Sequence, residues 1–134
     1  MAELSTKEVL ATYRTIAVVG CSKDPGKDAH TVPAYMQAHG YRVIPVNPTA
    51  TEILGERAYP SLAAVPEPYD IVCLFRPSDQ VGPIVDEAIR TGKAKVIWMQ
   101  LGIANEAAAA KARAAGLRVI MDRCLRIEHR LHFP

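Results

Sequence analysis

The fold is decided by the stretch TIAVVG, residues 15–20. Its run of small and β-branched residues predicts a strand, and Gly20 ends it. After Thr15 neither face of this strand carries a polar side chain, which is typical of parallel sheets covered by helices on both faces. The residues that follow, 21–30, contain Pro25 and Gly26 and are predicted to form a loop.

Further apolar stretches along the chain predict four more strands, and helical patterns lie between most of them. The strands are expected at residues 41–46, 70–75, 95–99 and 117–121. The helices are expected at residues 6–13, between Thr31 and Gly40, at 79–90, between Asn105 and Gly116, and at 125–132, with Thr31, Ser78 and Asn105 as N-caps and Ser5 and Glu8 as a capping box. Residues 47–68 are predicted to be irregular, apart from a short helical turn at 61–65 capped by Ser61.

This alternation predicts an α/β fold with three layers, in which a doubly wound parallel sheet of five strands lies between helices. Right-handed crossovers favour the strand order 3-2-1-4-5. Ligands of such sheets bind beyond the carboxyl ends of the strands, where the strand order reverses, here between the first and fourth strands. The loops at that edge are residues 20–30, 47–51, 76–79, 100–104 and 122–125.

Size and composition narrow the class of protein. A chain of 134 residues fits one domain, which we expect to span residues 1–134. The net charge of +2 is too small for a nucleic-acid surface, and no apolar run is long enough to cross a membrane. Residues 1–7 lack the order of a secretory signal, and three cysteines are too few for a disulfide framework, so we expect a cytoplasmic protein.

The loop after the first strand does not match the common nucleotide motifs. A dinucleotide fingerprint G-x-G-x-x-G would need glycines where Ser22 and Pro25 stand, and Asn47 ends the second strand in place of an acid. A P-loop fails because its spacing is wrong by one residue and Asp28 replaces the hydroxyl that binds magnesium. NAD and P-loop nucleotides are therefore disfavoured.

The same loop nevertheless suits a phosphate. Ser22, Lys23 and Lys27 precede the N-terminus of a helix, where main-chain N–H groups and the helix dipole favour an anion. His30 is a further candidate hydrogen-bond donor to phosphate. The alternative is that each lysine is an ordinary solvated residue.

Several segments, in their order and spacing, resemble the stand-alone CoA-binding-domain proteins, which are similar to the N-terminal domain of the succinyl-CoA synthetase alpha subunit. The likeness covers residues 15–130. The segments that carry it are AVVG with Ser22 and Pro25, residues 40–48 (GYRVIPVNP), residues 72–76 (VCLFR), residues 98–102 (WMQLG) and residues 121–124 (MDRC).

The resemblance implies a Rossmann-like fold that binds coenzyme A. The loop of Gly20, Cys21, Ser22 and Lys23 would hold the phosphates. Asn47, Pro48 and Lys27 would lie near the adenosine 3′-phosphate, Phe75 and Arg76 would border the adenine and pantetheine, and Gln100, Gly102 and Ile103 would line the pantetheine path. In the synthetase, acyl transfer uses a phosphorylated histidine of a second domain, which this chain lacks, so we expect no catalytic residues.

The leading hypothesis is therefore a protein that binds CoA or an acyl-CoA without catalysis. One alternative is an enzyme dependent on an NADP-type nucleotide, with Lys23 or Arg76 on the 2′-phosphate. Another is an interaction module with a vestigial pocket, and a protein partner or homo-oligomer stays open in every case. No metal site is expected, since His129 and His132 have no third ligand nearby, and a mixed disulfide of CoA with Cys21 or Cys124 is a minor hypothesis.

Overall fold

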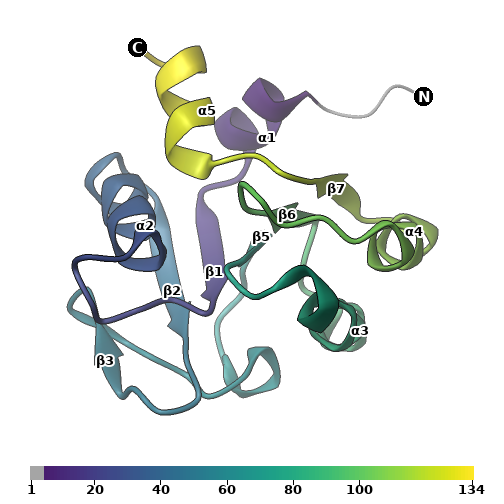
Figure 1. The fold of residues 1–134 in the computed structure, drawn as a ribbon, viewed down its shortest axis with the longest axis horizontal. Helices are drawn as coiled ribbons and strands as arrows, with labels where there is room; N and C mark the ends of the chain where they lie inside the picture. The colour runs from purple at the N-terminus through teal and green to yellow at the C-terminus, as the bar shows by residue number, and fades with distance from the viewer. Residues whose placement is uncertain (1–4) are drawn as a thin grey trace.

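A computed structural model describes residues 5–134 and shows a five-stranded parallel sheet between two layers of helices (Figure 1). The strands are β1 (Thr15–Val19), β2 (Arg42–Val46), β5 (Ile71–Leu74), β6 (Val96–Met99) and β7 (Arg118–Ile120). All four pairings between them are parallel. The predicted α/β class, the three layers and the five parallel strands are confirmed.

The predicted strand order is wrong. The sheet runs β2-β1-β5-β6-β7, so the third strand lies beside the first, with Ile16 opposite Ile71, and not outside the second. Every residue of β5 is fully buried, as expected for a strand inside the sheet, whereas β2 begins with the exposed Arg42 and forms the edge. The strand order therefore reverses between β1 and β5, and the loops of these two strands flank the expected ligand crevice.

Alternate residues of each strand face opposite layers. Ile16 and Val18 of β1 pack towards α1 (Thr6–Thr12), α2 (Asp28–Ala38) and α5 (Leu125–His132). Ala17 and Val19 pack towards α3 (Val81–Thr91) and α4 (Glu106–Ala114) (Figure 1). Both faces of the sheet are thus covered, which explains why the strands read as continuously apolar.

The helix caps were predicted with mixed success. The capping box of Ser5 and Glu8 forms as expected, and the Asn105 side chain accepts a hydrogen bond from the Ala108 N–H at 3.0 Å. The prediction that Thr31 caps the second helix is wrong, because α2 already begins at Asp28. Ser78 does not cap α3 either: it begins the 3-10 helix η2 (Ser78–Gln80), and its hydroxyl accepts from the Ala104 N–H at 3.1 Å.

The stretch predicted to be irregular contains a small hairpin. Strands β3 (Glu52–Ile53) and β4 (Glu56–Arg57) pair antiparallel across Leu54 and Gly55, whose φ angles of 57° and 74° are both positive. Two successive positive φ angles fit a type I′ hairpin turn, but a leucine at the first position hides the signal in the sequence. The helical turn predicted at residues 61–65 exists as the 3-10 helix η1 (Leu62–Ala64), without a side-chain cap from Ser61.

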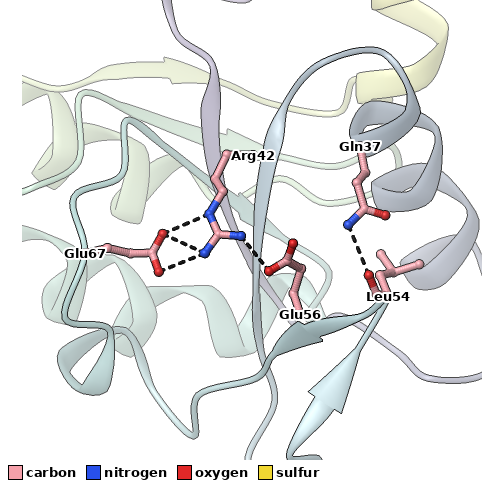
Figure 2. A network of polar contacts seen from close by, with 5 residues as sticks. All are labelled: Gln37, Arg42, Leu54, Glu56 and Glu67. Atoms are coloured by element: carbon pink, nitrogen blue, oxygen red, sulfur yellow. Dashed lines mark hydrogen bonds and ion pairs between the residues drawn. The ribbon is translucent and has the colours of Figure 1, made fainter.

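The hairpin is attached to the rest of the domain by side chains (Figure 2). The Arg42 guanidinium donates to Glu56 at 2.6 Å and to both carboxylate oxygens of Glu67 at 2.9 Å. The Gln37 amide of α2 donates to the Leu54 carbonyl at 3.1 Å. These contacts fix the segment that joins β2 to β5. Within residues 5–134, no helix has the length and apolar character that crossing a membrane requires.

Candidate functional site

A cleft of about 500 Å³ opens at the carboxyl ends of β1, β2 and β5. It lies where the strand order reverses, as expected for a sheet of this type. Eight of the predicted site residues line it: Gly20, Cys21, Ser22, Lys27, Asn47, Pro48, Phe75 and Arg76. Their contact with a ligand stays a prediction, but the fold does bring them together.

Gly20 allows the first and third strand loops to approach each other closely. Its φ of +88° favours glycine, and a Cβ built on it would lie 2.6 Å from the Phe75 carbonyl oxygen and 3.1 Å from Cδ of Arg76. The Gly20 N–H donates to the Val46 carbonyl at 3.0 Å. The cleft wall therefore depends on a residue without a side chain at this position.

The loop after Gly20 is held by its own hydrogen bonds. The Ser22 hydroxyl accepts from the Asp24 N–H at 3.0 Å, and the Asp24 carboxylate accepts from the Gly26 N–H at 2.9 Å. Nδ1 of His30 donates to the Ser22 carbonyl at 2.7 Å. His30 thus orders the loop and is absent from the lining of the cleft, and its predicted contact with a phosphate stays a prediction.

The charges at the cleft suit an anion. Among the described residues, Lys27 forms no ion pair, and the Arg76 guanidinium donates only to the Gln80 amide oxygen, at 2.6 Å. No side chain caps the N-terminus of α2, and Ala29 of its first turn lines the cleft. Two cations without ion pairs among the described residues, beside an open helix N-terminus, favour a phosphate. Lys23 is exposed and does not line the cleft.

Asn47 braces two of the cleft loops. Its side-chain amide donates to the Cys21 carbonyl at 2.9 Å, and its oxygen accepts from the N–H groups of Thr49 and Ala50 at 2.9 Å and 3.0 Å. The residue lies at the cleft wall, as predicted, but both ends of its amide are already bonded to protein. We therefore interpret Asn47 chiefly as a residue that positions the β1 and β2 loops.

A second cleft, of about 360 Å³, lies beside the first. The two share Ala29, Phe75 and Arg76 in their linings, so they adjoin along the carboxyl edge, and the pair is called the groove below. The rest of its lining is Asp28, Pro77, Gln100, Leu101, Ile103, Cys124, Arg126 and Ile127.

Gln100 is the buried polar group of this second cleft. The residue is 5% exposed, and its side-chain oxygen accepts from the Leu125 N–H at 3.3 Å. Its amide nitrogen has no protein partner within residues 5–134, so it is available to an acceptor in the groove. Gly102 does not line the groove. Its φ is +84° and its N–H donates to Asp122 at 2.6 Å, which holds the loop that carries Gln100.

The Cys21 thiol at the first cleft is poorly suited to nucleophilic chemistry. Cys21 is fully buried, and this desolvation raises its pKa to about 12. Burial likewise raises the pKa of Cys73. Since the thiolate is the reactive form, the structure argues against a mixed disulfide of CoA with Cys21.

His129 belongs to an aromatic cluster. Its Nδ1 lies 2.8 Å from the Tyr35 hydroxyl, and its ring contacts those of His39, Tyr41 and Phe133. Burial is the main cause that lowers the pKa of His129. Nowhere in residues 5–134 do three His, Cys, Asp or Glu side chains gather as metal ligands would.

Sequence reasoning missed several lining residues that come from outside the loops it considered. Ser61 follows the hairpin, and Ile84 and Glu87 lie on α3. Ile84 and Glu87 reach the first cleft because β5 and α3 adjoin β1, which the wrong strand order hid. Ser61 is placed there by Tyr59, which pairs with Val46 of β2. Arg126 and Ile127 lie in the first turn of α5, one and two residues beyond the loop that the sequence placed at the edge.

Comparisons of the sequence and the structure with known proteins lead to the same family. The model of the CoA binding domain family matches residues 14–130. The YneT protein of Bacillus subtilis is 43% identical over 123 residues, which cover 92% of this chain and 90% of that protein. A structure from Pyrococcus horikoshii OT3 has a TM-score of 0.91 at 38% identity and covers both chains completely.

A longer relative contains a matching segment. The ADP-forming acetate–CoA ligase II of Archaeoglobus fulgidus is 26% identical over 95 residues, which cover 69% of this chain but 14% of that protein. The resemblance expected from the loop sequences is thus confirmed both by a relative of similar length and by a longer ligase that contains a matching segment. Since the family match extends over nearly all of the described fold, this chain belongs to the CoA binding domain family.

Proposed function

We propose that this protein binds coenzyme A or an acyl-CoA along the groove at the carboxyl edge of its sheet. The observation that carries the proposal is that the two clefts adjoin and share Ala29, Phe75 and Arg76 in their linings. An extended ligand with a charged centre and an uncharged arm fits a groove of this form. Family membership supports the same ligand.

The residues divide among the parts of CoA by their chemistry. Lys27, Arg76 and the open N-terminus of α2 would hold the phosphates, and Gly20 lets the main chain approach them. Phe75 and Arg76 would border the passage between the clefts. The free amide nitrogen of Gln100 would donate to a carbonyl of the pantetheine arm, whose peptide-like groups need partners when buried.

We further propose that the protein performs no chemistry of its own on the bound ligand. A nucleophile needs an adjacent base or a lowered pKa, whereas the Cys21 pKa is raised by burial. The protein would act in the cytoplasm as a carrier or sensor of CoA, or as a separate subunit of a larger acyl-CoA enzyme.

Thermal unfolding with a panel of ligands tests the proposal. A ligand that binds only the folded state stabilises it by about 2.7 kcal/mol at a concentration of 100 Kd. CoA should raise Tm, and 3′-dephospho-CoA should raise it less. Stabilisation by NADPH but not by CoA would favour a nucleotide-dependent enzyme, and no shift with any ligand, ATP and NAD included, would favour a vestigial pocket.

A further inference from the structure

The first cleft has walls of opposite charge. Lys27 leads into α2 on one side of the sheet, whereas Glu87 lies on α3 on the other side (Figure 1). A phosphate is attracted to the first wall and repelled by the second. The two ends of a bound ligand should therefore differ: the phosphates should lie at the Lys27 side, and the group beside Glu87 should be one that donates hydrogen bonds.

The Glu87 carboxylate is fixed in place but not saturated. One of its oxygens accepts from the Leu62 N–H at 3.2 Å, and among the described residues it takes part in no ion pair. The hydroxyl of Ser61, the residue before Leu62, has no hydrogen-bond partner within residues 5–134. Glu87 also lines a smaller hollow with Arg90 and Lys93. Its second carboxylate oxygen and the Ser61 hydroxyl have no hydrogen-bond partner among residues 5–134.

The surroundings of these two polar groups are apolar. Val46, Pro60 and Ile84 line the same cleft. Apolar walls with one acceptor and one hydroxyl at the edge suit a flat heteroaromatic ring that carries an amine. The faces of such a ring bury apolar area, and its amine donates to the carboxylate.

We infer that Glu87, together with Ser61, recognises the adenine ring of the ligand through its exocyclic amine. This inference rests on the proposed function, because it assigns one end of CoA within the groove. The adenine would lie on the α3 side of the first cleft. The phosphates would follow at Lys27 and Arg76, and the pantetheine arm would pass Phe75 towards Gln100.

The ribose hydroxyl is a poorer partner for Glu87 than the amine is. In CoA the 3′-carbon of this ribose carries a phosphate, next to the free 2′-hydroxyl. A carboxylate that accepted from the 2′-hydroxyl would therefore face that phosphate at close range, and like charges repel strongly in a cleft. The exocyclic amine lies at the far edge of the base, where this repulsion is weakest.

Isothermal titration with CoA and with its deaminated analogue, in which hypoxanthine replaces adenine, tests the assignment. The analogue presents a carbonyl oxygen where CoA presents the amine, so it would face the carboxylate without a proton between them. The native protein should bind CoA at least tenfold more tightly than the analogue. In Glu87→Gln the difference should fall to about threefold or less, because an amide can donate as well as accept.

The control variant is Glu52→Gln, which removes an exposed carboxylate that does not line the groove and should keep the native preference. A preference in Glu87→Gln equal to the native one, or no preference in the native protein, would overturn the assignment while leaving CoA binding intact. Absence of binding by either ligand would instead overturn the proposed function. The glutamine of Glu87→Gln retains an acceptor for the Leu62 N–H. If this variant still fails to fold, Ser61→Ala provides a second test and should weaken CoA binding at least threefold. Unchanged affinity of Ser61→Ala would overturn the assignment.

Discussion

Replacement of Gly20 by alanine should damage the fold and the groove together. The new Cβ would lie 2.6 Å from the Phe75 carbonyl oxygen, which is main chain and cannot move away as a flexible side chain would. The φ of +88° adds a separate cost, since L-residues in this region lose roughly 1–2 kcal/mol. Together the two effects should lower the free energy of unfolding by about 2–4 kcal/mol.

A matched variant separates these two contributions. Gly40 has nearly the same φ, +91°, but a Cβ there would meet nothing within 4 Å. Gly40→Ala should therefore show the backbone cost alone, about 1–2 kcal/mol. The difference between the two variants measures the contact between the β1 loop and the β5 loop.

Urea denaturation of both variants, followed by circular dichroism, gives these free energies. CoA titration gives the second readout: Gly20→Ala should lose at least tenfold in affinity, whereas Gly40→Ala should bind normally. If Gly20→Ala were no less stable than Gly40→Ala, the close approach of the two loops would be refuted. Normal CoA affinity in Gly20→Ala would refute the role of these loops in the groove.

Three further predictions concern charge, thiol reactivity and pH. In CoA titrations, Lys27→Ala and Arg76→Ala should each weaken binding by about tenfold to a hundredfold, and the loss should be smaller at high salt. Lys23 lies outside the cleft wall, so Lys23→Ala should have a smaller effect. Equal losses of affinity for the two lysine variants would contradict the placement of the phosphates. Cys21, with its pKa raised to about 12, should resist iodoacetamide at pH 8 in the folded protein and react in urea, as peptide mass spectrometry would show; rapid labelling of the folded state would contradict its burial. The folded state lowers the pKa of His129, so the unfolded state binds more protons between the two pKa values. The free energy of unfolding should therefore fall as the pH drops below about 6.5. In urea melts His129→Phe should lose less stability over this range than the native protein, and an unchanged pH dependence would show that other groups cause the fall in stability.

Local sequence was enough to predict the strands but not their order. The composition of residues 15–19 and 71–74 marks them as buried on both faces. Both candidate orders place such strands in a helix-covered parallel sheet and obey right-handed connections, so local patterns do not choose between them. The order depends on contacts between segments far apart in the sequence, and in the folded protein β5 and β6 are equally inaccessible, with β5 at the centre.

The residues of the groove that could be predicted are those whose position follows from the local sequence and not from the strand order. Gly20, Asn47 and Phe75 follow strands directly, so any parallel arrangement brings them to the carboxyl edge. Glu87 reaches the first cleft because β5, the strand before α3, lies beside β1, whereas Ser61 is placed by the pairing of Tyr59 with Val46 of β2. His30 was expected to face a ligand. In the structure α2 begins at Asp28, so His30 lies in the first turn of this helix and its Nδ1 donates to the Ser22 carbonyl. The sequence of the loop alone does not reveal this contact.

The central claim is that CoA occupies the groove at the carboxyl edge, and an NMR titration of labelled protein tests it most directly. Addition of CoA should shift the main-chain amides of Ser22, Ala29, Phe75 and Leu101, which line the two connected clefts. The amides of Lys93 and Gly116, which line neither cleft, should stay in place. Shifts confined to these last positions, or none at saturating CoA, would contradict the account.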